Sequence, residues 1–377
     1  MDCFDDPYLE HIYLRCGVHV VPRSSDRRST RDITLLAGMV HSSRCERNIY
    51  PATVRGSDMG NASLRAPAKT AVEQCMNLQA DESCVIVTDD KRKAIAEALY
   101  AVATEITEDT AMVRYPVGDQ HGSEPPAPVA AAMRGGDVVL APTTKSLSHT
   151  NARTDATDAG ARMATLPGIT DGVFLMGLDA DYDRIREECA RVHELVADAE
   201  TIRVTSPQGT DITLQIGDRG WLEDTGIVHE PGDFSNLPAG EVFVSPESGD
   251  GTVVVDGTMR PYGKLEDGQT IEFTVEDGQV TSIADDEIRE QVETAAAEVG
   301  DNAYNLAELG IGTNVAVTDL VGSVLLDEKT GGTVHLAIGD DHGIGGDVEA
   351  PIHLDGILTE PTVYADGEAI ELPSAGE

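Results

Sequence analysis

Between residues 82 and 199, short apolar runs alternate with segments that have helical periodicity. Three runs have the length and apolar content of buried strands: SCVIVTD (83–89), GDVVLAPT (136–143) and GVFLMGL (172–178). Amphipathic helices are predicted for KRKAIAEALYAVATEI (91–106), TNARTDATDAGARMATLPG (150–168) and DYDRIREECARVHELVADA (181–199). Strands that alternate with helices predict an α/β fold with a mainly parallel sheet.

The pattern changes near residue 200, where strands begin to follow one another directly. TIRVTSPQGTDITLQIG (201–217) contains two alternating runs joined by a Pro-Gln-Gly turn, and GQTIEFTVEDGQVTSI (268–283) contains an Asp-Gly hairpin signal. One predicted helix, at roughly 284–299, interrupts these strands. We therefore predict an α/β domain over residues 59–200, followed by a β-rich α+β domain over residues 201–377.

Charge limits the classes of partner. Lys and Arg number 27 and Asp and Glu number 67, which gives a net charge of -40 spread along the chain. This negative charge argues against binding to nucleic acid or to anionic lipid, because both are themselves negatively charged. It is typical of proteins that remain soluble in high salt. The chain lacks an apolar run long enough to cross a membrane, and its six cysteines form no C-x-x-C pair. We therefore expect a cytoplasmic, halophilic protein.

The first 58 residues differ from the rest of the chain in their charge. They contain eight acidic residues, eight arginines and no lysine, so their net charge is 8 − 8 = 0 and residues 59–377 carry the whole -40. They also show no sustained helical or strand periodicity. We interpret residues 1–58 as a non-native segment from too early a start codon, with a disordered extension as the alternative.

Candidate chemistry is concentrated in the second predicted domain. His335 and His353 each lie within a short β-like run, and Asp355 follows His353 by two positions. Residues i and i+2 of a strand face the same side, so His353 and Asp355 should project together. With Glu241 and Glu308 they form a set of three carboxylates and two imidazoles. That set suits Zn²⁺, Co²⁺ or Mn²⁺ and is large enough for two ions, as in hydrolytic two-metal sites.

The segments that carry these residues resemble one family. NLPAGEVFVSPE, NLAELGIGTN, LLDEKTGGTVHLAIGDD and PIHLDGILTEPTVYADG are similar, in this order, to blocks of the thermophilic metallo-aminopeptidases of the aminopeptidase T type, peptidase family M29. The resemblance implies that two divalent ions are held by Glu241, Glu308, His335, His353 and Asp355. It also implies a homodimeric protease that releases N-terminal amino acids from peptide substrates. The charge marks the chain as a haloarchaeal-type member.

Two features leave other functions open. The family usually has a tyrosine seven residues after the first metal-binding histidine, where this chain has His342. His342 is therefore predicted to be a catalytic hydrogen-bond donor or a general acid or base, with an exposed loop histidine as the alternative. The chain also resembles the iron-dependent dioxygenases that cleave 2,5-dihydroxypyridine, which hold one Fe(II) with a set that includes an H-x-D like His353 and Asp355. Because both glutamates are present, we expect the two-metal hydrolase, with the dioxygenase and a non-catalytic homologue as alternatives.

Overall fold

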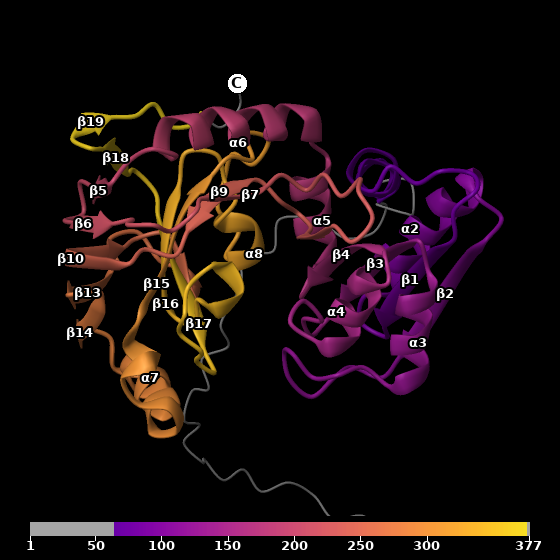
Figure 1. Ribbon diagram of the computed structural model, residues 1–377, viewed down its shortest axis with the longest axis horizontal. Coiled ribbons are helices and arrows are strands. Elements are labelled where there is room, and N and C mark those ends of the chain that lie inside the picture. Colours follow the sequence, from indigo (N-terminus) through magenta and orange to yellow (C-terminus); the bar gives the residue numbers. More distant parts are fainter. Residues whose placement is uncertain (1–63, 375–377) are drawn as a thin grey trace, which may run out of the picture. The chain divides into compact units, whose positions relative to one another are not determined.

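The computed structural model describes residues 64–374, all within one compact unit that spans Gly56–Glu377 (Figure 1). The segment 1–58, which we interpret as non-native, lies outside the described residues. None of the described helices is long and apolar enough to cross a membrane.

The first part of the described chain builds a five-stranded parallel sheet in the order β2-β1-β3-β4-β8. Its strands are β1 (Cys84–Asp89), β2 (Thr110–Tyr115), β3 (Val138–Thr143), β4 (Arg162–Pro167) and β8 (Phe234–Asn236). β1 and β3 are buried along their whole length, as expected for strands with helices on both sides. The prediction of an α/β fold with a mainly parallel sheet is confirmed.

The helices of this part agree with the pattern of apolar residues, with two exceptions. The helices are α1 (Arg65–Lys69), α2 (Lys93–Ile106), α3 (Ala127–Gly135), α4 (Asn151–Asp158), α5 (Asp171–Leu178) and α6 (Tyr182–Val196), and a π-helical turn over Thr70–Cys75 follows α1. The helix predicted over 150–168 is wrong in its second half, because Gly160 turns the chain at φ 99° and β4 follows. The strand predicted over 172–178 is also wrong, since this run is α5, capped by the Thr170 hydroxyl, which accepts from the Val173 amide.

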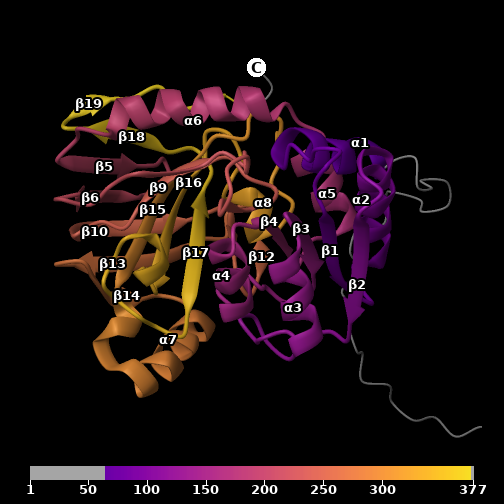
Figure 2. The same ribbon diagram turned by 45° about the vertical axis from the view of Figure 1, so that its right-hand side comes forward.

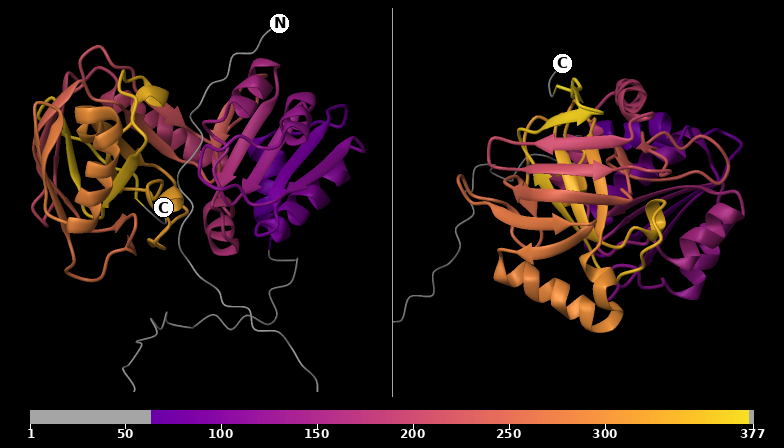
Figure 3. Two further views of the ribbon diagram at one scale, coloured as in Figure 1. Left: turned by 90° about the horizontal axis from the view of Figure 1, so that it is seen from below. Right: turned by 60° about the vertical axis from the view of Figure 1, so that its left-hand side comes forward.

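The rest of the chain forms two antiparallel sheets of seven strands each (Figures 1 and 3). The first sheet has the order β14-β13-β10-β6-β5-β18-β19, with bounds Gln279–Ile283, Ile271–Glu276, Ser248–Val255, Asp211–Gln215, Thr201–Thr205, Thr362–Ala365 and Glu368–Ala369. The second has the order β12-β11-β17-β16-β15-β9-β7, with bounds Gly263–Lys264, Thr258–Met259, His353–Leu358, Val334–Gly339, Leu306–Gly312, Glu241–Val244 and Leu222–Asp224. Figure 3 shows the strands of one sheet crossing those of the other, and both sheets contribute to one hydrophobic core.

Local signals placed the connections of this β-rich part correctly. The predicted Asp-Gly hairpin joins β13 to β14, with φ of 51° at Asp277 and 76° at Gly278, as a two-residue turn of this kind requires. The predicted helix is α7 (Asp286–Val299), which packs against β14 (Figure 2). Strand β8 pairs with β4 of the parallel sheet although it follows residue 200. The domain boundary near residue 200 stays a prediction.

Candidate metal centre

Four adjacent strands of the second seven-stranded sheet carry the five candidate ligands. Glu241 begins β9, Glu308 lies in β15, His335 in β16, and His353 and Asp355 begin β17. The strand register places all five on one face of the sheet, because directly paired residues and every second residue along a strand share a face. Ala337 of β16, for example, pairs with Glu308 on one side and with Asp355 on the other. The face shared by His353 and Asp355 was expected from the sequence.

The opposite face of these strands is apolar. Val242, Leu309, Leu336 and Leu354 alternate with the candidate ligands and are buried in the core shared with the other sheet. Hydrophobic burial of one face therefore fixes the register, and the register holds the polar side chains of the other face in place.

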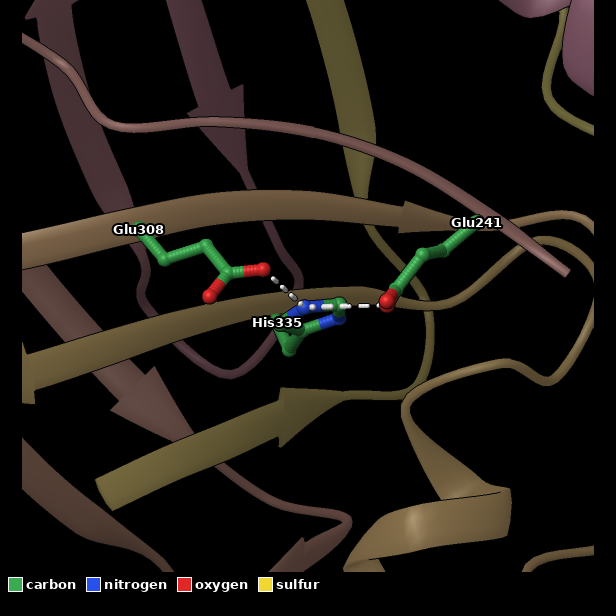
Figure 4. A group of neighbouring side chains, drawn as sticks. All are labelled: Glu241, Glu308 and His335. Atoms are coloured by element: carbon green, nitrogen blue, oxygen red, sulfur yellow. Dashed lines mark hydrogen bonds and ion pairs between the residues drawn. The ribbon is translucent and has the colours of Figure 1, made fainter. Parts of the chain in front are cut away.

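Glu308 joins the candidate ligands into one cluster. Its Oε1 lies 3.3 Å from Nε2 of His335, and its Oε2 lies 3.1 Å from Nε2 of His353. Nε2 of His353 is also 3.1 Å from Oδ1 of Asp355. On the other side, Oε2 of Glu241 lies 3.5 Å from Nε2 of His335, so the imidazole stands between two carboxylates (Figure 4). Two groups of three could each hold a metal ion: Glu241 with Glu308 and His335, and Glu308 with His353 and Asp355.

Several details of the cluster fit a bound metal ion. The Nδ1 of His353 donates to the carbonyl of Asp340 at 2.7 Å, which leaves Nε2 as the nitrogen that faces the carboxylates. Oε2 of Glu241 and Nδ1 of His335 are buried, and neither has a hydrogen-bond partner among the described residues. A buried carboxylate oxygen without a partner is costly, and a nearby cation, either a metal ion or an ammonium group, lowers that cost.

Electrostatics couple the imidazoles to the carboxylates. Burial alone would raise the pKa of Glu308, but hydrogen bonds from His335 and His353 lower it to about 2. Burial alone would lower the pKa of His335, but the bond to Glu308 and the charges of Glu241 and Glu308 raise it to about 9. For Asp355, the nearby His353 outweighs burial and lowers the pKa. The cluster therefore holds Glu308 and Asp355 as ionised carboxylates in a buried place, as hard divalent cations require, whereas burial raises the pKa of Glu241 to about 8.

Gly310 makes room for the ring of His335. A Cβ atom at position 310 would lie 2.1 Å from both Cε1 and Nε2 of the imidazole, which is far inside van der Waals contact. We expect Gly310→Ala to displace His335 and, with it, the Glu308 carboxylate that His335 contacts, and so to weaken metal binding about tenfold or more, as loss of ligand positioning does. Equilibrium dialysis with Mn²⁺ measures this, with Gly343→Ala as the control because a Cβ there would meet no atom closer than 3.7 Å. Unchanged Mn²⁺ affinity in Gly310→Ala would show that His335 does not position Glu308 for metal binding.

A model of the 2,5-dihydroxypyridine 5,6-dioxygenase family matches residues 64–372 of the chain. The chain belongs to this family. A curated 2,5-dihydroxypyridine 5,6-dioxygenase from Pseudomonas putida KT2440 is 25% identical over 191 residues, which cover 47% of this chain and 54% of that protein. The match thus spans about half the length of this relative.

Solved structures show that the fold is shared more widely than the family. The structure of 2,5-dihydroxypyridine dioxygenase from Pseudomonas putida KT2440 superposes with a TM-score of 0.69 at 19% identity, covering 83% of this chain and 96% of the other. Wild-type AmpT from Thermus thermophilus superposes with a TM-score of 0.59 at 17% identity, covering 84% and 98%. At these identities the structures show the fold alone.

Membership of the dioxygenase family overturns the main interpretation of the sequence. The expectation of an aminopeptidase, and with it of a hydrolase acting on peptides, is wrong. That expectation rests on the resemblance of four segments to the aminopeptidase T family and on the presence of both glutamates, which favours two metal ions over one. In the structure Glu241 forms a buried ion pair with Lys329, so a glutamate at this position does not by itself indicate a second ion. The expected homodimer and cytoplasmic location stay predictions.

The structure does not bring His342 into either candidate group. His342 begins a 3₁₀ turn (His342–Ile344), its side chain is 64% exposed, and its Nε2 lies 3.9 Å from Oε1 of Glu349. Its catalytic role stays a prediction. The neighbouring Gly343 instead lies against another histidine, since a Cβ there would be 3.7 Å from Cε1 of His149.

Sequence reasoning missed the buried Lys329 beside the cluster and its partly buried acidic neighbours Glu328 and Asp224. Lys329 is 3% exposed, and its Nζ is ion-paired with Glu241, lies 2.9 Å from Oε1 of Glu328 and lies 4.0 Å from Oδ2 of Asp224. One signal was available, because the chain has few lysines and this one directly follows Asp-Glu before the strand of His335. Arg260 was missed as well; its charge contributes to lowering the pKa of Asp355.

Proposed function

We propose that the protein is an iron-dependent dioxygenase that opens a dihydroxylated pyridine ring or a closely similar heteroaromatic ring. The observation that carries this proposal is the family match over residues 64–372, which includes every candidate ligand. The donor set supports it, since imidazoles combined with carboxylates are typical of non-haem Fe(II) oxygenases. The substrate named for the Pseudomonas putida relative is the starting point for a test.

Glu308, His353 and Asp355, with His335 beside them, are the residues that would hold Fe²⁺. Ferrous iron would supply the one-electron chemistry that allows O₂ to react with an aromatic ring. The protein's own contribution is positional. The Asp340 carbonyl orients His353, and the paired strands fix the spacing of the carboxylates.

Two further side chains have the chemistry to handle a hydroxylated ring at this site. Arg260 directly follows β11, and Met259 of this strand pairs with Gly356, the residue after Asp355. The positive charge of Arg260 acts on Asp355 and would favour an anionic ring oxygen at the site. Burial lowers the pKa of His149. The charge of Asp340 raises this pKa and the charge of His353 lowers it, so both side chains lie near the His149 imidazole. A neutral imidazole at this place could accept a proton from a ring hydroxyl.

The test is oxygen uptake by Fe²⁺-loaded protein in high salt. A dioxygenase places both atoms of O₂ in its product, so we expect one O₂ consumed per 2,5-dihydroxypyridine without added reductant, and two ¹⁸O atoms in the product from ¹⁸O₂. Protein treated with a chelator is the control. A protein that binds Fe²⁺ but consumes no O₂ with this or related dihydroxypyridines would contradict the proposal and favour a non-catalytic homologue.

A further inference from the structure

Lys329 places a positive charge inside the candidate metal centre. Its ammonium group is ion-paired with Oε1 of Glu241 and lies 2.9 Å from Oε1 of Glu328. The main chain fixes the position of this residue, because the Lys329 carbonyl accepts from the amide of Asn314 at 2.8 Å, two residues after the end of β15. The charge is therefore part of the fold and does not depend on a flexible surface side chain.

The two candidate metal groups differ in their relation to this ammonium ion. Glu241, the direct partner of Lys329, belongs only to the group that also contains Glu308 and His335. A divalent ion in that group would share Glu241 with the ammonium ion in a buried place, where repulsion between cations is weakly screened. The group of Glu308, His353 and Asp355 contains no partner of Lys329 and is more open to solvent.

We propose that Lys329 is a resident cation that takes the place of a second metal ion, so that the chain binds a single divalent ion between Glu308, His353 and Asp355. Without the ammonium group, the buried Glu241 and the partly buried Asp224 and Glu328 would be three neighbouring carboxylates with no cation between them. Such an arrangement attracts a divalent ion. Lys329 thereby sets the number of metal ions, and this inference rests on the metal centre of the proposed function.

The experiment compares Mn²⁺ binding by the wild type and by Lys329→Met, which keeps the length of the side chain and removes its charge. Equilibrium dialysis should give one Mn²⁺ per chain for the wild type and two for Lys329→Met. Electron paramagnetic resonance should change from the signal of an isolated Mn²⁺ to that of a spin-coupled pair. Lys264→Met is the matched control, because Lys264 bonds only the Leu320 carbonyl among its described partners, and it should bind one ion.

Two Mn²⁺ per wild-type chain, or one per folded Lys329→Met chain, would overturn the inference. If Lys329→Met does not fold, Glu241→Gln provides a second test. If Glu241 only pairs with Lys329, Glu241→Gln should still bind one Mn²⁺ with an affinity within about threefold of the wild type. If Glu241 is a required metal ligand, the variant should lose the ion. Loss of Mn²⁺ from folded Glu241→Gln would therefore count against the inference.

Failure of this inference and failure of the proposed function give different results. One Mn²⁺ per chain, with no O₂ uptake by the Fe²⁺-loaded protein, would reject the dioxygenase and retain the role of Lys329. Two metal ions per chain, together with O₂ uptake, would reject the role of Lys329 and retain the dioxygenase.

Discussion

Replacement of Glu308 by glutamine should lower the affinity for divalent ions by more than about 100-fold and remove oxygen uptake. Glu308 is the one residue common to both candidate groups, and its two oxygens contact His335 and His353. An amide keeps the shape of the side chain but replaces one acceptor oxygen by a donor and removes the negative charge. One imidazole would then face an NH₂ group, and the bound cation would lose a ligand charge.

The measurement is metal content after dialysis against a fixed concentration of free Mn²⁺, together with oxygen uptake of the Fe²⁺-loaded protein. Glu360→Gln is the matched control, because it makes the same chemical change at an exposed position and should behave as the wild type. A Glu308→Gln protein with full metal content and full activity would show that the ligand set is misassigned.

Replacement of Arg162 by methionine should lower the free energy of unfolding by about 3 kcal/mol. Arg162 begins β4, and its two terminal nitrogens each lie 2.8 Å from an oxygen of Glu82. One of them also donates to the Met76 carbonyl at 3.1 Å. The guanidinium is mostly buried, so its removal leaves a partly buried carboxylate and a carbonyl without their partner. Urea unfolding at neutral pH measures the loss.

The pH dependence gives an independent check on this ion pair. The bond from Arg162 lowers the pKa of Glu82, so the pair contributes stability above the pKa that Glu82 has in the unfolded chain. That contribution is lost as the pH falls through the folded-state pKa, and the difference from the wild type should therefore shrink below about pH 4. Arg203→Met, which breaks the exposed pair with Asp211, should leave the midpoint nearly unchanged. A wild-type midpoint for Arg162→Met would contradict the prediction.

The fold was predictable wherever a local pattern decides the structure. Alternating apolar residues and the Asp277-Gly278 turn indicated the β-rich part, because both features act over a few neighbouring residues. The run 172–178 misled because a short, fully apolar segment has no periodicity that distinguishes a buried helix from a strand. There the hydroxyl cap of Thr170 and the surrounding core decided the outcome.

The five candidate ligands were predictable from the sequence, whereas their charged neighbours and the reaction were not. The i, i+2 spacing of His353 and Asp355 showed that they share a face, and the strand register confirms this. The ion pair between Lys329 and Glu241 joins residues 88 positions apart, so no local pattern could reveal it. The residue types also do not fix the reaction, because imidazoles and carboxylates serve both hydrolytic and oxidative metal centres.

The placement of all five residues on one sheet face determines which kinds of mutation the site can tolerate. Substitution of one apolar residue for another at Leu336 or Leu354 leaves the polar face in register. Insertion or deletion of a single residue between His353 and Leu358 would turn the imidazole or the carboxylate toward the core and bring leucine to the polar face. Over evolutionary time, these strands should therefore accumulate conservative replacements while their lengths stay constant, with length variation confined to the connecting loops.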